Sequence, residues 1–282
     1  MDAPIIEVAC HAGVCYGVER ALSLALDAAA ADASVCTLGP LIHNPIVVRE
    51  LEERGVTTAA SVAECAEGTV IIRAHGVVPE VIDEARERGL NVIDATCPYV
   101  KKVHMAAEKL VREGYQLIVV GESGHPEVEG IMGHAGGAAS VVSTPEEAAA
   151  LEVGRKVGVV VQTTQTPEAL ADIVDVLVRR CSELRVVNTI CAATQERQDS
   201  AAELAERVDA MVVVGGKNSG NTRRLAQICA ERCNATYHIE DADELSAAWL
   251  SDARRIGVTA GASTPAAHIE RTVLAIQQLV GV

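Results

Sequence analysis

The sequence predicts an α/β protein of three pseudo-repeated lobes, each with a small parallel sheet. Two observations indicate this fold class. Short apolar runs rich in valine and isoleucine, such as residues 69–74, 116–121 and 210–216, alternate with segments of helical periodicity, which is typical of parallel strands joined by crossover helices. A unit of cysteine, helix, strand and polar loop then occurs three times, at intervals of 82 and 94 residues, as expected of a duplicated supersecondary unit.

Each repeat opens with a cysteine at the expected start of a helix: Cys15, Cys97 and Cys191. The second is the clearest, because the β-branched residues Val92 and Ile93 lead into a turn and Pro98 suits a first helical position. Exposed amides and the dipole at a helix N-terminus favour a thiolate over a thiol. Equivalent positions in a repeat therefore predict three reactive thiolates that share one site.

Polar loops follow the cysteines with constant spacing. The loop after the next strand carries a polar residue 28 positions after each cysteine: His43, His125 and Ser219. A further polar loop follows in each repeat, with His75, with Thr163 and Thr164, and with Ser263. Because ligands of open parallel sheets bind at the carboxyl ends of the strands, the three lobes are expected to aim these loops at a common centre.

Three thiolates without a fourth suit a cubane iron–sulfur cluster, whose remaining iron can accept a substrate oxygen. Zinc with three ligands and a water is the alternative. An all-thiolate set favours the cluster, and the residues alone do not decide between the two.

The loops beside the cysteines are rich in histidines, hydroxyls and amides, which suit a phosphate or diphosphate bound with few permanent charges. The candidates are His43, His75, His125, Glu127, Thr163, Thr164, Thr194, Ser219, Asn221 and Ser263. A glycine-rich dinucleotide motif and a Walker motif are both absent from the sequence. A carboxylate beside a diphosphate suits proton delivery, and spacing alone does not separate Glu127 from Glu129.

The net charge, the apolar runs and the cysteine count exclude several classes of protein. A net charge of −15 disfavours nucleic acid or an anionic membrane as partner, and no apolar run has the length of a membrane span. The start of the chain does not read as a secretory signal. Nine cysteines, an odd number, then argue against a disulfide framework and for a cytoplasmic protein.

With these residues identified, the sequence resembles the 4-hydroxy-3-methylbut-2-enyl diphosphate reductases of the non-mevalonate isoprenoid pathway. Nine motifs carry the resemblance, in the order of the family and almost from end to end: GVCYGVERA, LGPLIHNP, RAHGV, DATCP, KVHM, GHPEVEG, QTTQ, GGKNSGNT and TAGAS. The resemblance implies a [4Fe–4S] cluster on Cys15, Cys97 and Cys191. It also implies that the substrate hydroxyl binds the unique iron, two electrons arrive singly, and water leaves to give isopentenyl or dimethylallyl diphosphate.

The resemblance also assigns roles by motif. Glu127 takes the position of the proton donor, and Thr163 the position that orients the hydroxyl. The residues at diphosphate-binding positions are His43, His75, His125, Thr194, Ser219, Gly220, Asn221 and Ser263. The family further implies ferredoxin or flavodoxin, with its reductase, as electron donor.

Two departures from the family pattern stand out. Gly220 occupies a position where we expect a second serine, so one hydroxyl contact to the diphosphate is missing unless the amide replaces it. Cys10 lies five residues before Cys15 but breaks the 28-residue spacing, so Cys15 remains the expected ligand. By analogy the lobes comprise residues 15–97, residues 98–190, and residues 191–282 together with 1–14.

Two other classes of protein share parts of this pattern. Quinolinate synthase also resembles three α/β lobes around a three-cysteine cluster, but its substrates carry no phosphate, so the His/Ser/Asn set has less use there. A redox or iron sensor needs no carboxylate beside an open iron, and it usually presents a surface for a partner or nucleic acid.

Overall fold

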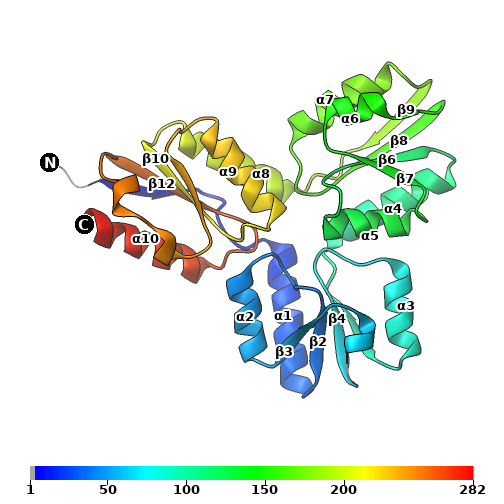
Figure 1. Ribbon diagram of the computed structural model, residues 1–282, viewed down its shortest axis with the longest axis horizontal. Coiled ribbons are helices and arrows are strands. Elements are labelled where there is room, and N and C mark those ends of the chain that lie inside the picture. Colours follow the sequence, from blue (N-terminus) through cyan, green and yellow to red (C-terminus); the bar gives the residue numbers. More distant parts are fainter. Residues whose placement is uncertain (1–3, 66, 282) are drawn as a thin grey trace. The chain divides into compact units, whose positions relative to one another are not determined.

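A computed structural model of the chain describes residues 4–65 and 67–281. In this described part the strands form three sheets of four strands each, and every pairing is parallel (Figure 1). The α/β class and the three small parallel sheets predicted from the sequence are therefore confirmed.

The three sheets have the same strand order, which is the structural form of the sequence repeat. One sheet has the order β3–β2–β4–β5, with β2 (Val35–Leu38), β3 (Val56–Ala59), β4 (Thr69–Ile72) and β5 (Asn91–Asp94). Another has the order β7–β6–β8–β9, with β6 (Gln116–Val120), β7 (Ala139–Val142), β8 (Lys156–Val161) and β9 (Glu183–Val187).

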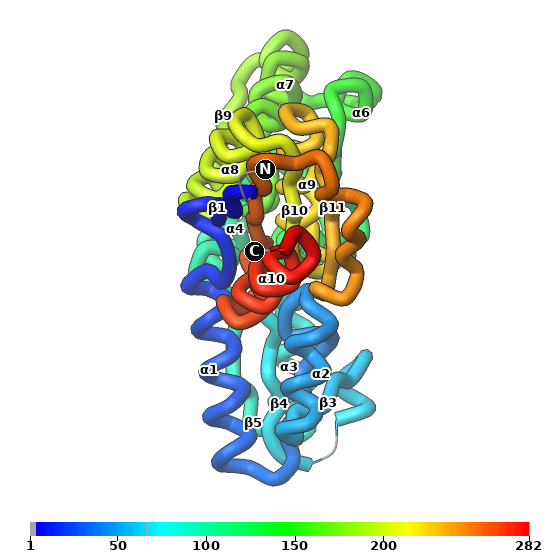
Figure 2. Tube along the Cα trace, turned by 90° about the vertical axis from the view of Figure 1, so that its left-hand side faces the viewer, coloured from blue at the N-terminus to red at the C-terminus, as the bar shows by residue number. Residues whose placement is uncertain are grey.

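The remaining sheet joins the two ends of the chain. Read in the same direction its order is β11–β10–β12–β1, with β10 (Ala210–Val214), β11 (Thr236–Ile239), β12 (Arg255–Ala260) and β1 (Ile5–Val8). The N-terminal strand β1 pairs with β12, so it completes the sheet of the C-terminal segment, and Figure 2 shows β1 and α10 in the same part of the molecule. In each repeat the edge strand, β5, β9 or β1, leads into a cysteine.

Helices connect the strands at equivalent places. The helices that follow the cysteines are α1 (Tyr16–Ala31), α4 (Pro98–Arg112) and α8 (Ala192–Ala205). Those that follow the next strand are α2 (Pro45–Glu53), α5 (Pro126–His134) and α9 (Gly220–Ala230). The other helices are α3 (Pro79–Glu87), α6 (Pro145–Ala150), α7 (Pro167–Val178) and α10 (Ala266–Val280), with 3₁₀ turns at 62–64, 242–244 and 247–249.

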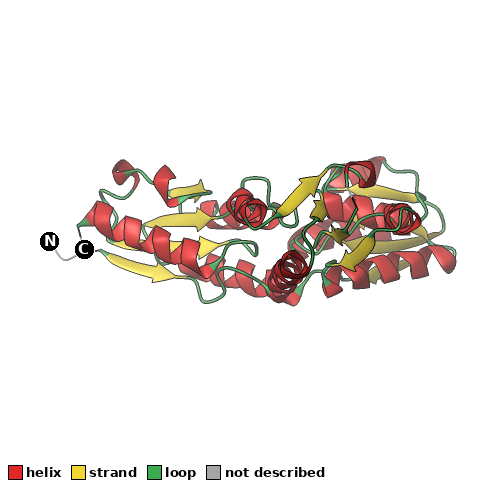
Figure 3. Cartoon of the chain, turned by 90° about the horizontal axis from the view of Figure 1, so that it is seen from below, coloured by secondary structure: helices red, strands yellow, loops and turns green. Residues whose placement is uncertain are grey.

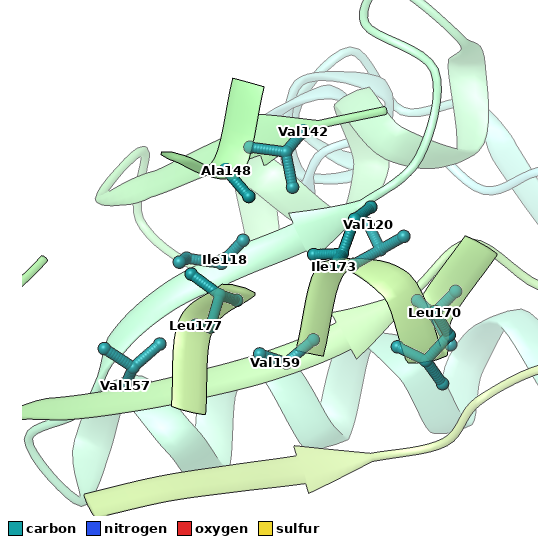
Figure 4. Close-up of a cluster of buried hydrophobic side chains, with 10 residues drawn as sticks. Ile118, Val120, Val142, Ala148, Val157, Val159, Leu170, Ile173 and Leu177 are labelled. Atoms are coloured by element: carbon teal, nitrogen blue, oxygen red, sulfur yellow. The ribbon is translucent and has the colours of Figure 1, made fainter. Parts of the chain in front are cut away.

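The sheet that contains β6 and β8 illustrates how the core forms. Its central strands are buried on both faces, which is why their sequence is a continuous apolar run. Val157 and Val159 of β8 pack with α6 and α7 (Figure 4), whereas Val160 faces the cluster formed with α4 and α5. Figure 3 shows strands and helices as adjoining layers.

By its contacts the chain divides into two compact units. The first unit comprises Met1–Val18, His43–Arg49 and Ala192–Val282, and the second comprises Glu19–Ile42 and Glu50–Cys191. The second unit thus contains two of the three sheets. The lobe boundaries expected from the sequence stay a prediction.

The cysteine count gave one wrong expectation. Cys36 and Cys65 form a disulfide, with Cα atoms 6.3 Å apart, although an odd count argued against disulfides. The cause is the topology: β3 lies beside β2, and the 3₁₀ turn that follows β3 brings Cys65 back to Cys36 on β2. No disulfide of the described residues includes the other cysteines, Cys10, Cys15, Cys97, Cys181, Cys191, Cys229 and Cys233. Within the described residues no helix has the length and apolarity to cross a membrane.

Candidate active site

The three cysteines at the repeat starts are held by the same backbone contact. The amide of each donates to a carbonyl in the loop after the neighbouring strand: Cys15 to Ala262 at 3.2 Å, Cys97 to Ala74 at 3.0 Å, and Cys191 to Thr163 at 3.1 Å. Each cysteine is half-buried, lies outside the Cys36–Cys65 disulfide and comes directly before a helix. The acceptor carbonyls belong to the equivalent motifs TAGAS, RAHGV and QTTQ, so the repeat extends to individual hydrogen bonds.

The second unit places a buried carboxyl group against the QTTQ loop. Glu127 is 2% exposed, and its Oε1 accepts a hydrogen bond from the amide of Thr163 at 2.7 Å. Its Oε2 and the Thr163 hydroxyl are 2.9 Å apart. Burial raises the pKa of Glu127 from 4.5 to about 7, although both contacts from Thr163 act in the opposite direction. A carboxyl group with this pKa can hold or release a proton near neutral pH.

The local sequence explains why Glu127 points there. His125 caps the N-terminus of α5, its Nδ1 accepting from the Glu127 amide at 3.1 Å, and Pro126 occupies the first helical position. Because Nδ1 accepts a hydrogen bond, the proton of the neutral imidazole resides on Nε2. His75 lies edge-on to His125, with ring centroids 5.8 Å apart. His75, His125, Glu127, Thr163, Cys97 and Cys191 all belong to the second unit.

Spacing in the sequence did not separate Glu129 from Glu127 as the candidate proton donor, but the structure places the two side chains in different surroundings. Its side chain is exposed, and it lines a separate cavity of about 240 Å³ together with Arg73 and Val78. Thr164 is half-buried. The structure therefore brings Glu127, and not Glu129, together with Thr163.

The first unit gathers a second set of the predicted residues. His43 and Ser263 meet through a hydrogen bond from the Ser263 hydroxyl to the His43 carbonyl, at 3.2 Å. The loop before α9 approaches the same strand end, because a Cβ on Gly216 would lie only 2.4 Å from the His43 carbonyl oxygen. A glycine is therefore required for the KNSGN loop and the His43 loop to meet.

The loop before α9 leads to three predicted residues at the start of that helix, Ser219, Gly220 and Asn221. Ser219 caps α9 by accepting from the Thr222 amide at 3.3 Å, and Gly220 is the first residue of that helix. Thr194 is buried in the first turn of α8. Exposed amides at a helix start are suited to bind an anion.

Asn221 carries a buried side-chain amide that can still form hydrogen bonds. It is 4% exposed, and neither its Nδ2 nor its Oδ1 has a hydrogen-bond partner among the described residues. A buried amide that makes no side-chain hydrogen bond costs about 1–3 kcal/mol. The Oγ1 atom of neighbouring Thr222 is unsatisfied as well.

Sequence reasoning missed two residues that hold the loops in place. Asn44 donates to the Ser263 carbonyl at 2.8 Å and accepts from the amides of Ile46 and Val47. Its position between a motif histidine and a proline is the signal of a helix cap.

The second missed residue is His104 of α4, which is buried with its ring stacked on His134 at 4.1 Å. A Cβ on Gly76 would lie 2.8 Å from its Cε1, and one on Gly130 would lie 3.2 Å from its Nε2. Burial lowers the pKa of His104 to about 3, so the ring is neutral near pH 7. His104 thus packs between the loop that carries His75 and the helix that carries Glu127.

Within the described residues no group of three or more His, Cys, Asp or Glu side chains is close enough to hold a metal ion. The donor chemistry nonetheless fits an iron–sulfur cluster, because three cysteines outside the disulfide are presented at helix starts by equivalent backbone contacts.

Comparison with known proteins gives a consistent result. The family model described as LytB protein matches residues 6–277. A 4-hydroxy-3-methylbut-2-enyl diphosphate reductase from Geobacter sulfurreducens is 48% identical over 273 residues, which cover 97% of each chain. A protein of the same name from Pelobacter propionicus is 49% identical over 255 residues, covering 90% of this chain and 91% of its own.

Two solved structures that are similar to this chain carry the same kind of name as these relatives. One is described as (E)-4-hydroxy-3-methyl-but-2-enyl diphosphate reductase, the terminal enzyme of the non-mevalonate pathway. It is 47% identical with a TM-score of 0.71, and covers 98% of this chain and 99% of its own. The E-1-hydroxy-2-methyl-but-2-enyl-4-diphosphate reductase from Plasmodium falciparum is 26% identical with a TM-score of 0.93, and covers 98% of this chain and 89% of its own.

Proposed function

This chain belongs to the LytB protein family, and from that premise we propose how its residues reduce 4-hydroxy-3-methylbut-2-enyl diphosphate. The family and its curated reductases make the chain an oxidoreductase of the non-mevalonate pathway. Its reaction converts one substrate, two electrons and two protons into water and isopentenyl or dimethylallyl diphosphate. The family match sets aside quinolinate synthase and a non-enzymatic sensor.

Cys15, Cys97 and Cys191 would hold a [4Fe–4S] cluster. The common amide-to-carbonyl contact supports this assignment, because it fixes all three cysteines in the same way at equivalent strand ends. When bound, the cluster supplies the electrons and the Lewis acid that lets the allylic hydroxyl leave. An all-thiolate set favours iron–sulfur over zinc.

The diphosphate would be bound by polar groups of the motif loops. His43, Ser219, Asn221 and Ser263 supply donors, with Thr194 and the Gly220 amide, and His75 and His125 supply imidazoles. The unsatisfied Nδ2 of Asn221 supports this role, because a phosphate oxygen would accept its hydrogen bond. The neutral His125 offers its Nε2 proton to the same ligand.

Glu127 and Thr163 would deliver a proton. Oε1 of Glu127 already accepts the Thr163 amide, so the proton of the neutral acid resides on Oε2, 2.9 Å from the Thr163 hydroxyl. That proton can pass to Oγ1 as the hydroxyl gives its own proton to the leaving oxygen or to the allylic carbon. The pKa of about 7 keeps a large share of Glu127 protonated at neutral pH.

The single observation that carries this function is the buried Glu127–Thr163 pair directly beside Cys191, whose amide is bound to the Thr163 carbonyl. The experiment is anaerobic iron and sulfide analysis with EPR of the reduced protein, wild type beside Cys97→Ser and the control Cys10→Ser. We expect about four irons and four sulfides in the wild type and the control, and loss in Cys97→Ser. Zinc in place of iron, or a cluster that is indifferent to Cys97, would contradict the three-thiolate assignment.

A further inference from the structure

One helix of the second unit carries a large share of the positive charge of the chain. α4 contains Lys101, Lys102, Lys109 and Arg112 against a single carboxylate, Glu108, so its net charge is +3. The whole chain has a net charge of −15. Three of the five lysines of the chain lie in this one helix.

The exposed side of α4 combines these cations with large apolar groups. Tyr99 is 37% exposed and Met105 is 60% exposed. The Nζ atom of Lys102 lies 5.0 Å from the centroid of the Tyr99 ring. Residues 99, 102, 105, 109 and 112 are spaced three or four apart and are all exposed, so they form one surface, which we name the α4 stripe. Aromatic residues, methionine and arginine are enriched at protein interfaces, and the lysines add positive charge that complements an acidic partner.

Two of the cations are available to a partner. Lys101 pairs with Asp94 at 2.6 Å, and Lys109 lies 3.9 Å from Glu113. Lys102 and Arg112 have no ion-pair partner among the described residues. An approaching carboxylate would therefore gain these two contacts without displacing one inside the protein.

The stripe begins beside a residue of the proposed redox centre. Cys97 caps the N-terminus of α4, and at a rise of 1.5 Å per residue Lys102 follows it by about 8 Å along the axis. A protein that docks on the stripe thus has its surface close to Cys97. In a chain as acidic as this one, a local basic surface also selects where an acidic partner approaches.

We propose that the α4 stripe is the docking surface for an acidic one-electron carrier protein. This inference rests on the proposed function, because the reduction consumes two electrons per product. Each docking event oxidises one reduced carrier by one electron and reduces the enzyme by one electron, so two events complete a turnover. The two protons come from Glu127 and from solvent.

The test compares Lys102→Gln/Arg112→Gln with the matched control Arg88→Gln/Arg179→Gln, which removes the same charge from exposed sites directly after α3 and α7. Turnover is driven either by a reduced acidic flavodoxin or by reduced methyl viologen. At an ionic strength of about 0.01 M we expect KM for flavodoxin to rise about five- to tenfold in the stripe variant and less than about twofold in the control. Viologen-driven turnover should be equal in all three proteins.

An unchanged KM, an equal rise in the control, or an equal loss with viologen would overturn the docking surface. A second measurement does not use turnover: the Kd of labelled flavodoxin for each loaded protein, by fluorescence anisotropy. It should rise in the stripe variant alone, and the difference should vanish at about 1 M salt. If wild type fails to reduce the diphosphate with viologen, the proposed function is wrong, whereas these Kd values still decide the docking surface.

Discussion

Two buried polar sites, one in each unit, differ in how their side chains are hydrogen-bonded. In the second unit both oxygens of Glu127 have a partner on Thr163, and His125 accepts the amide of Glu127. In the first unit both polar atoms of the Asn221 side chain, and the hydroxyl of Thr222, are buried without a partner. Under the proposed function, the groups that would handle the proton are organised before substrate binds, whereas the Asn221 amide would gain its partner from the ligand.

The largest effect is expected at the preorganised group. Glu127→Gln keeps the shape of the side chain but cannot donate a carboxylic proton. Turnover should fall about 10²- to 10⁴-fold while iron content and the EPR signal stay at wild-type values. Glu129→Gln is the matched control and should retain full turnover. Full activity of Glu127→Gln would remove Glu127 from the proton path.

The pH profile tests the same group without a mutation. The acid form of Glu127 is the proposed donor, and burial raises the pKa of this group to about 7, so the donor form is present below pH 7 and is lost above it. Turnover at saturating substrate should therefore be level in the acid range and fall about tenfold for each pH unit above 7. The residual rate of Glu127→Gln should not show this fall. A level wild-type profile up to pH 9 would assign the proton to another group.

The comparison itself is tested by removing one polar group from each unit. Asn221→Leu removes an amide without a partner, so the free energy of unfolding of the substrate-free protein should stay equal or rise by about 1 kcal/mol, while KM rises about ten- to a hundredfold. Thr163→Val removes a satisfied hydroxyl and should lower the free energy of unfolding by about 1–3 kcal/mol. Urea unfolding at pH 7 measures the free energy of unfolding of both variants. Equal destabilisation by Asn221→Leu and Thr163→Val would contradict the distinction between these two sites.

The smallest effect is expected at the first residue of α9. Gly220→Ser restores a hydroxyl beside the diphosphate groups, and one neutral hydrogen bond is worth about 0.5–1.5 kcal/mol. KM for the substrate should therefore fall about two- to tenfold, as measured by steady-state kinetics with kcat unchanged. If KM is unchanged, the Gly220 amide already fills that role.

Much of the fold could be predicted because its signals are local. Continuous valine and isoleucine runs mark strands that are buried on both faces, and the 28-residue spacing from Cys15, Cys97 and Cys191 reflects a strand order that the structure repeats three times. The Cys36–Cys65 pairing could not be predicted, because it depends on how the turn after β3 returns to β2.

The candidate site could also be predicted only in part. Motif order and spacing selected Glu127, Thr163 and Asn221, but no pattern revealed that the Thr163 amide binds Oε1 of Glu127, or that Asn221 is buried without a partner. Both facts arise from backbone paths between loops that are far apart in the sequence. His104 was missed for the same reason, since its role depends on glycines 76 and 130 that leave room for its ring.

The shared amide-to-carbonyl contact of the three cysteines has a consequence for the life of the enzyme in air. The backbone of each cysteine is fastened to its own sheet, so these positions do not depend on iron for their local structure. If these cysteines hold the proposed cluster, its oxidative loss would leave the backbone of each cysteine still bound to its sheet. Such a scaffold would be reloaded with iron and sulfide without degradation and resynthesis of the chain.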